Sequence, residues 1–292
     1  MKVLITGAGG MVARALAAHC ASRGDTVFAH TRETLDITNA GNVREVFARD
    51  QPETVINCAA WTDVDGCELN PERAVLVNAE AVEILATHSR MAGASFVTIS
   101  TDYVFDGAKE GFYTQRDDPA PQSAYGIAKL QGERRALRAS ARTVVVRSGW
   151  IFGTGGRNFL ATAVERARRG EHLKAISDAY GTPTYAPHLA ARLRELAERD
   201  LPGTYHVVNS GAGASFFEFA QEAVRAAGVE GVEVESVASD TLARPAPRPR
   251  NSRLRCLLSE AIGLAPLPEW REALREFAGA GKTEGEEGKG KG

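Results

Sequence analysis

Features that define several other protein classes are scarce or missing in this sequence of 292 residues. Its four cysteines, Cys20, Cys58, Cys67 and Cys256, include no C-x-x-C pair. They therefore provide neither a disulfide framework nor a zinc site, and they fit the reducing environment of the cytoplasm. The six histidines show no ligand spacing either, so we expect no catalytic metal.

Long apolar segments and an excess of one charge are also missing. No apolar stretch reaches the ~18–20 residues that would span a bilayer. The first apolar run is short and ends in glycines, unlike the core of a signal peptide. The net charge is −2, with 25% charged and 43% apolar residues. This composition is typical of a soluble globular protein and gives no reason to expect nucleic-acid or membrane partners.

The first half of the chain alternates between two kinds of segment. Apolar, β-branched runs predict strands at 2–6, 26–30, 54–60, 95–100 and 143–148. Helical periods lie between them, near 11–22, 40–50, 72–91 and 124–139. Continuous apolar strands that alternate with helices indicate a parallel sheet covered on both faces. We therefore predict an α/β fold, a doubly wound (Rossmann) sheet, over residues 1–150.

Residues 151–281 show a looser pattern. Helices are expected near 157–169, 187–199, 215–227 and 268–277, and strands near 173–176, 204–209 and 232–237. This pattern predicts a smaller α/β lobe that binds substrate and interleaves with the first domain, with later segments returning to the sheet. The proline-rich segment 243–254 is expected to be an extended loop over the substrate, a linker being the alternative. Residues 282–292 lack apolar anchors and are expected to form a disordered tail.

A glycine-rich turn follows the first strand, in "TGAGGMVARAL" (6–16). Its spacing is not G-x-G-x-x-G, because Val12 stands at the third position, but Gly7, Gly10 and Ala13 fit G-x-x-G-x-x-A. Glycines allow a close approach to a pyrophosphate, and the helix N-terminus that follows offers free N–H groups. Because the turn lies between a first strand and a helix, a dinucleotide site is favoured over a glycine turn without a ligand.

The second strand ends in "FAHTRE" (28–33), without the acid that would bind the ribose hydroxyls of NAD. Thr31 and Arg32 stand there instead and predict a site for the 2′-phosphate of NADPH. A solvated arginine is the alternative, which leaves NADH open. We further expect Asp36 and Ile37 beside the adenine. The segment after the third strand should line the pyrophosphate and the nicotinamide ribose, through Ala59, Ala60, Trp61 and Thr62.

Two further motifs contain polar side chains that could take part in a reaction. The fourth strand ends in "STDYVFDG" (100–107), and the next predicted helix contains Tyr125 and Lys129, which a helix places on one face. Free tyrosine has a pKa of ~10, and a nearby ammonium favours its phenolate. Tyr125 could then pass a proton beside the nicotinamide while Thr101 holds the substrate oxygen, and Lys129 can also hydrogen-bond the nicotinamide ribose of the cofactor. A Y-x-x-x-K pair alone is more often a surface helix face, so this hypothesis depends on the other motifs.

These motifs occur together with "VRSGWIFG" (146–153), "YGTPT" (180–184) and "RPRNSRL" (248–254). With them the chain, from residue 1 to about 277, resembles the extended short-chain dehydrogenase/reductase family, and within it the dTDP-4-dehydrorhamnose reductase group. The resemblance implies a catalytic set of Thr101, Tyr125 and Lys129. It implies that the cofactor is held by Gly10, Met11, Val12, Ala60, Trp61 and Thr62. It implies that the substrate is contacted by Thr101, Asp102, Tyr125, Trp150, Arg248 and Asn251.

The activity that the resemblance implies is reduction of the 4-keto group of dTDP-4-dehydro-L-rhamnose by NADPH, the last step of dTDP-rhamnose biosynthesis for polysaccharides. Another nucleotide-sugar reductase, an epimerase or a dehydratase is an alternative. A dehydratase is disfavoured because no glutamate follows Thr101 and Asp102. A non-catalytic, NADP-binding regulatory subunit is a further alternative, from a different class. The sequence leaves open whether the protein forms a homodimer. Some members share a magnesium through a glutamate where this chain has Ala15, so we expect no metal.

Overall fold

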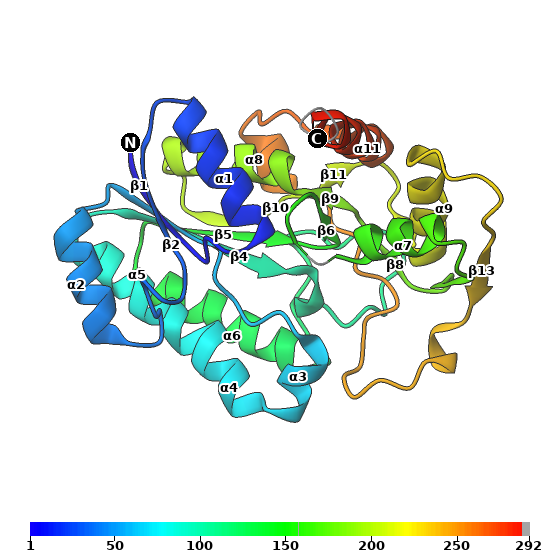
Figure 1. Cartoon of the computed structure of the whole chain (residues 1–292). Coiled ribbons are helices and arrows are strands. Elements are labelled where there is room, and N and C mark those ends of the chain that lie inside the picture. The colour runs from blue at the N-terminus through cyan, green and yellow to red at the C-terminus, as the bar shows by residue number, and fades with distance from the viewer. Residues whose placement is uncertain (157, 288–292) are drawn as a thin grey trace.

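A six-stranded parallel sheet forms the centre of the molecule (Figure 1). The computed structural model of the chain describes residues 1–156 and 158–287. The strand order is β10-β5-β4-β3-β1-β2, and every neighbouring pair is parallel. This arrangement confirms the predicted doubly wound sheet. The strands are β1 (Lys2–Thr6), β2 (Thr26–His30), β3 (Thr54–Asn57), β4 (Ser95–Thr101), β5 (Thr143–Ser148) and β10 (Gly203–His206).

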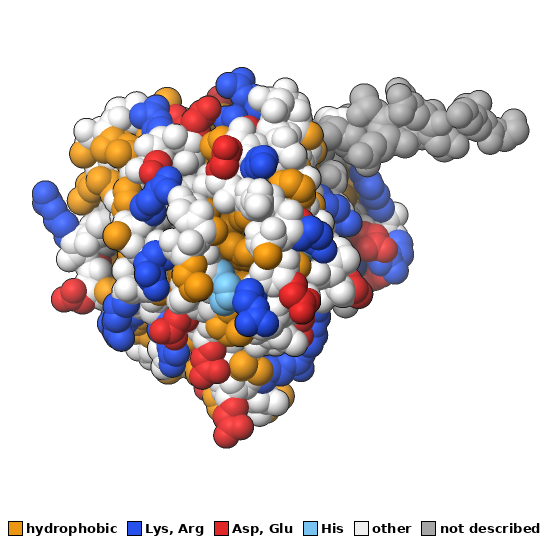
Figure 2. Space-filling model, turned by 90° about the vertical axis from the view of Figure 1, so that its left-hand side faces the viewer, with side chains coloured by type: hydrophobic (Ala, Val, Ile, Leu, Met, Phe, Trp, Pro, Cys, Tyr) orange, Lys and Arg blue, Asp and Glu red, His pale blue; other side chains and the backbone are white. Residues whose placement is uncertain are grey.

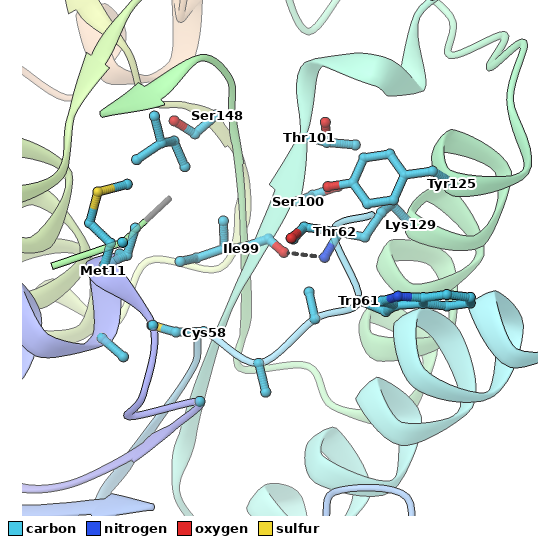
Figure 3. A pocket seen from close by; sticks show the side chains of 18 of the residues that line it. Met11, Cys58, Trp61, Thr62, Ile99, Ser100, Thr101, Tyr125, Lys129 and Ser148 are labelled. Carbon is cyan, nitrogen blue, oxygen red and sulfur yellow. Dashed lines mark hydrogen bonds between the residues drawn. The ribbon is translucent and has the colours of Figure 1, made fainter. Parts of the chain in front are cut away.

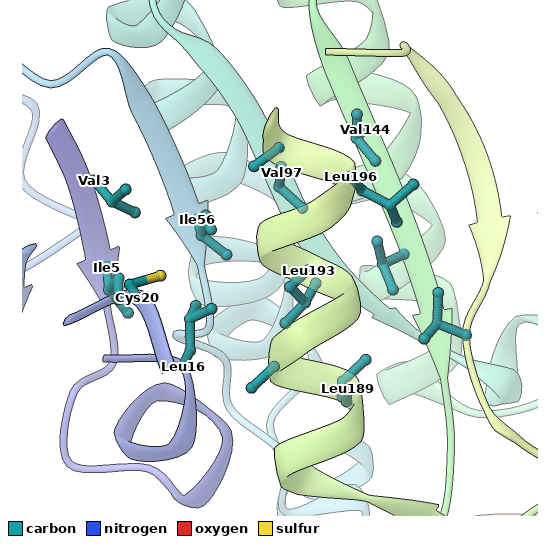
Figure 4. Packing of buried hydrophobic residues seen from close by; sticks show 14 of the residues in the cluster. Val3, Ile5, Leu16, Cys20, Ile56, Val97, Val144, Leu189, Leu193 and Leu196 are labelled. Carbon is teal, nitrogen blue, oxygen red and sulfur yellow. The ribbon is translucent and has the colours of Figure 1, made fainter. Parts of the chain in front are cut away.

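Helices cover both faces of this sheet. One face packs against α1 (Met11–Ser22) and α8 (Ala186–Arg199), whose Leu16 and Leu193 are fully buried against the strands (Figure 4). The opposite face packs against α2 (Ala40–Asp50), α5 (Ala81–Met91) and α6 (Ala124–Ala139). Because both faces are buried, the strands can be apolar along their whole length, which explains the continuous runs in the sequence.

The second half of the chain builds a smaller lobe from short paired strands and three helices. Its core includes Phe152, Phe219 and Trp270. The strands are β6 (Ile151–Phe152), β7 (Leu173–Ile176), β8 (Tyr180–Gly181), β9 (Thr184–Tyr185), β11 (Asn209–Ser210), β12 (Ala214–Ser215), β13 (Val234–Val237) and β14 (Leu267–Glu269). The helices are α7 (Phe159–Arg168), α9 (Phe216–Ala226) and α11 (Trp270–Glu287), and a short α10 (Leu257–Ala261) lies beside β10. Between β9 and β11 the chain returns to the main sheet as α8 and β10.

Several boundaries differ from those expected. Strand β3 ends at Asn57, so residues 58–60 leave the sheet as a loop. The helix expected over 72–91 is preceded by α3 (Val64–Leu69) and is divided into α4 (Pro71–Val75), a π-helix (Leu76–Glu80) and α5. Helix α11 continues to Glu287, so residues 282–287 of the expected tail are helical, and 288–292 lie outside the described residues.

The surface gives no sign of a single dominant charge on the side that lies at the left of Figure 1. On this side, shown in Figure 2, Lys and Arg side chains are mixed with Asp and Glu side chains and with small groups of hydrophobic ones. Among the described residues, no helix is long and apolar enough to cross a membrane.

A buried ion pair ties α6 to the sheet. Glu133 of α6 and Arg147 of β5 are joined by two hydrogen bonds, of 2.9 and 2.7 Å, and their side chains are 3% and 8% exposed. Ser100 of β4 donates its hydroxyl to the same carboxylate. Burial and the neighbouring Arg147 lower the pKa of His206 to about 4, which keeps this histidine neutral beside the guanidinium.

We expect Glu133→Gln to lower the free energy of unfolding by about 3–5 kcal/mol, because it leaves Arg147 as an uncompensated buried charge. The control is Glu83→Gln, which breaks the half-exposed pair between Glu83 and Arg135 and should cost less than about 1 kcal/mol. Urea denaturation of both variants measures the difference. Equal losses would contradict a structural role for the buried pair.

Candidate active site

A cavity of about 940 Å³ runs along the carboxyl ends of the main strands, where open α/β sheets bind ligands (Figure 3). The turn after β1, the loop after β3 and the end of β4 form one side. Helix α6, the segment after β5 and residues of α7 and α9 complete it. The cavity therefore lies between the sheet and the smaller lobe.

The glycine-rich turn is shaped for close approach. Gly7 has a φ of +69°, and a Cβ there would lie 2.8 Å from the Ala59 nitrogen. Gly10 is the N-cap of α1 and makes no side-chain cap, so the first N–H groups of this 12-residue helix lack a capping side chain. Gly7, Gly10, Met11 and Val12 all line the cavity. Such a cradle of backbone donors fits a dinucleotide diphosphate.

Three of the four residues predicted to lie beside the adenosine part of the cofactor line this cavity. Arg32, Asp36 and Ile37 line it. Thr31 does not line it, and its hydroxyl donates to the Glu33 carboxylate at 2.5 Å. The Asp36 carboxylate accepts the Thr38 hydroxyl at 2.7 Å, and this bond lowers the pKa of Asp36. Of the two residues predicted to bind the 2′-phosphate, Arg32 alone therefore lines the cavity.

The loop after β3 lines the cavity through Ala59, Ala60, Trp61 and Thr62. Asn78 holds this loop in two directions: its Oδ1 accepts the Trp61 N–H, and its Nδ2 donates to the Trp61 carbonyl, both at 2.9 Å. Asn78 lies in the π-helix, a distortion that is frequent at functional sites. Sequence reasoning missed Asn78, because a π-helix leaves no recognisable period.

Tyr125 and Lys129 project from α6 toward the cavity, one helical turn apart, beside Thr101 at the end of β4 (Figure 3). The Lys129 ammonium donates to the Ile99 carbonyl at 2.7 Å. Burial lowers the pKa of Lys129 to about 8, and burial raises the pKa of Tyr125 above its usual value. The phenol is therefore protonated at neutral pH, and a cation lies on the same helix face.

Asp102 is a buried carboxylate in the 3₁₀-helix η2 (Asp102–Val104), and it also lines the cavity. Its Oδ1 accepts the Thr101 hydroxyl at 3.0 Å, whereas its Oδ2 has no hydrogen-bond partner among the described residues. Burial raises the pKa of Asp102 to about 6. A Cβ on Gly149 would lie 2.4 Å from the Asp102 Cγ, so this position requires glycine. Sequence reasoning missed Gly149, although it precedes Trp150.

Trp150 has a left-handed backbone, with a φ of +49°. Its ring stacks on Phe216 at a centroid distance of 3.8 Å and packs on Gly181, where a Cβ would lie 2.1 Å from the indole. Trp150, Phe216 and Tyr103 line both the large cavity and a smaller one of about 210 Å³. Trp150 is therefore both packed and placed where the two cavities meet. Phe216 was not predicted.

The last two predicted residues lie away from the large cavity. Arg248 lines the smaller one, with its guanidinium paired to Asp65. Asn251 lines neither: its Nδ2 donates to the carbonyls of Lys109 and Gly111 at 2.7 Å, and its Oδ1 accepts from Arg253. All of the predicted site residues except Thr31, Arg248 and Asn251 therefore line the large cavity. Within the described part of the chain, no group of three or more His, Cys, Asp or Glu residues could hold a metal.

Comparison with known proteins adds an independent finding. The family model for the RmlD substrate binding domain matches residues 1–282. A dTDP-4-dehydrorhamnose reductase of Streptomyces griseus is 39% identical, over 94% of this chain and 91% of that protein. A probable dTDP-4,6-dihydroxy-2-methyloxan-3-one 4-ketoreductase of Streptomyces antibioticus is 38% identical, over 94% of both chains.

The fold comparison agrees. The crystal structure of a dTDP-4-dehydrorhamnose reductase from Bacillus anthracis in complex with NADP superposes with a TM-score of 0.91 at 33% identity, covering 94% of this chain and 97% of that one. The resemblance found in the sequence is thereby confirmed: the chain belongs to the RmlD substrate-binding-domain family.

Proposed function

We propose that this protein reduces the 4-keto group of dTDP-4-dehydro-L-rhamnose with NADPH, giving dTDP-L-rhamnose, as the last step of dTDP-rhamnose biosynthesis. The observation that carries the proposal is one cavity that holds both a dinucleotide cradle and the Thr101, Tyr125 and Lys129 set. The names of the relatives and the NADP in the Bacillus anthracis structure support the same assignment.

The cofactor site fits a dinucleotide phosphate. The uncapped start of α1 and the glycine turn would take the diphosphate, and Arg32 would take the 2′-phosphate. The loop at Trp61, held by Asn78, would flank the nicotinamide side. When bound, NADPH supplies the hydride that the sugar carbon accepts.

The chain's own residues then supply orientation and the proton. Tyr125 would hydrogen-bond the sugar carbonyl oxygen and donate its proton to it as the alcohol forms. The Thr101 hydroxyl, which donates to Asp102 in this structure, would turn to donate to the same oxygen. Lys129, cationic on the same face of α6, stabilises the phenolate that this transfer leaves. Asp102, with one free carboxylate oxygen, and Trp150 would orient the sugar ring.

A second candidate is reduction of another dTDP-linked keto sugar, which the name of the Streptomyces antibioticus relative favours. The regulatory-subunit alternative needs no proton relay, and the intact, buried Tyr125 and Lys129 weigh against it. We expect the protein to act in the cytoplasm, and a homodimer stays open. Assays over a panel of keto-sugar nucleotides, with this chain as the only protein, separate these alternatives through the loss of reduced-nicotinamide absorbance.

We expect Tyr125→Phe to lower kcat by about 10²–10⁴-fold while NADPH binding is kept, because only the proton donor is removed. Tyr103→Phe is the matched control, since Tyr103 lines the same cavity with its ring at right angles to Tyr125. Its kcat should stay within a few-fold of wild type. A Tyr125→Phe enzyme of near-normal turnover would refute the assigned role.

For Arg32→Ala we expect weaker NADPH binding, by about tenfold, with little change for NADH, because a single charge-assisted contact to the 2′-phosphate is lost. Cofactor titrations followed by fluorescence measure both affinities. NADH serves as the internal control, and equal losses for the two cofactors would rule out the contact.

The rate of reduction should fall as the pH rises through about 8, where Lys129 loses its proton in the free protein. Tyr125 has a raised pKa and stays protonated over that range, so the loss reflects the missing ammonium rather than the missing phenol proton. The kcat/KM for the sugar nucleotide, which reports the free enzyme, is the quantity to measure. A kcat/KM that rises above pH 8 would contradict this role of Lys129.

A further inference from the structure

The segment 238–250, here called the strap, leaves β13 and forms one wall of the smaller cavity. It contains the 3₁₀-helix η3 (Ser239–Thr241) and contributes Leu242, Arg244, Ala246 and Arg248, among others, to the lining. The facing wall includes Tyr103, Trp150 and Phe216, which also border the large cavity. The position of the strap therefore shapes the space next to the reacting groups.

The strap is anchored at both ends. Ser239 donates its N–H and its hydroxyl to the Asp178 carboxylate, at 2.8 and 3.0 Å. At the other end, Tyr180 donates its N–H to the Arg250 carbonyl at 2.7 Å, and Pro249 packs so closely on Gly107 that a Cβ there would lie 2.6 Å from the proline Cα. Between these anchors, the strap is hydrogen-bonded to one residue outside itself among those that the structure describes. This residue is Asp65.

Asp65 accepts hydrogen bonds from two residues of the strap. Its Oδ1 accepts the Ala246 N–H at 3.1 Å and the Arg248 Nη1 at 2.9 Å, and its Oδ2 accepts the Arg248 Nη2 at 2.9 Å. Arg248 also donates to the Ala246 carbonyl at 2.9 Å, which closes the group into a ring. The pairing with Arg248 lowers the pKa of Asp65, so the carboxylate is charged at neutral pH.

Asp65 is also placed to connect the strap to the cofactor side. It lies in the first turn of α3, which begins at Val64, directly after the loop that carries Trp61 and Thr62. The N-cap Asp63 accepts the Gly66 N–H at 2.9 Å and fixes the start of this helix. Nothing in the sequence pairs Asp65 with Arg248, because 183 positions separate them.

We propose that Asp65 is a positioning residue for the sugar nucleotide: by holding Ala246 and Arg248, it keeps the strap in place as the preformed wall of the smaller cavity. This inference rests on the proposed function for the identity of the substrate. A wall that is already ordered spares the substrate the conformational entropy of ordering it, so the strap contact acts on substrate affinity rather than on the chemical step. The residues proposed to bind the cofactor line the large cavity and none of them lines the smaller one, so we expect NADPH binding to be unaffected.

The test compares Asp65→Asn with the control Glu72→Gln, which removes one negative charge from the exposed surface of neighbouring α4. For Asp65→Asn we expect the KM for the sugar nucleotide to rise about threefold to tenfold, with kcat and the Kd for NADPH within twofold of wild type. Glu72→Gln should leave all three unchanged. Arg248→Gln should reproduce the rise, and the double variant should add little to it.

Hydrogen exchange of the Ala246 amide gives a readout that is independent of activity. Its N–H donates to Asp65, so Asp65→Asn should speed its exchange while amides of the main sheet keep their rates. Binding of dTDP, measured by calorimetry, should weaken by the same factor as the KM rises. If the wild-type chain reduces no dTDP-linked keto sugar, the proposed function fails, whereas the exchange and dTDP measurements still decide the role of Asp65.

Two results would overturn the inference. An unchanged KM together with unchanged Ala246 exchange would show that the strap holds its position without Asp65. A lower KM would show that Asp65 competes with the substrate for Arg248. Should Asp65→Asn lose its folded circular dichroism spectrum, Arg248→Gln breaks the same pair from the other side and is judged by the same two criteria.

Discussion

The seating of α6 against the sheet is the constraint on which the rest of the site depends. A Cβ on Gly126 would lie 2.3 Å from the Tyr103 carbonyl oxygen, and one on Gly132 would lie 2.2 Å from that of Asn78. With the helix this close, Tyr125, Lys129 and Glu133 form a buried polar stripe along one face. Each of the last two has its partner on the sheet: Lys129 binds the Ile99 carbonyl, and Glu133 binds Arg147.

A carboxylate and an ammonium group share the cavity, and burial shifts the pKa of both. Burial lowers the pKa of Lys129 and raises that of Asp102, so each group is held closer to neutrality than it would be in water. Pairs of titratable groups whose pKa values are shifted by their surroundings are typical of active sites. Here the shifts follow from packing, since Gly149 lets the Asp102 carboxylate lie directly against the β5 connection.

Motifs that are contiguous in the sequence predicted much of this molecule, whereas contacts between residues far apart in the chain could not be predicted from it. The glycine turn, the end of β4 and the Tyr125–Lys129 spacing are contiguous in the sequence, and the parallel sheet brings them to one edge. The sequence places Thr31 beside Arg32, but in the structure its hydroxyl binds Glu33 and it does not line the cavity. The Asp65–Arg248 pair joins residues far apart in the chain, and the π-helix at Asn78 packs closely against α6. Neither feature produces a periodic pattern in the sequence.

The return of α8 and β10 to the main sheet has a consequence for how the polypeptide matures. A nascent chain that has left the ribosome only as far as residue 150 still lacks the edge strand β10 and a covering helix, α8, on one face of the sheet. The apolar side chains of β3, β4 and β5 that α8 covers, such as Val97 and Val144, would then stay exposed to water until residues near 206 leave the ribosome. The main sheet is therefore complete only after a segment from the second half of the chain has joined it.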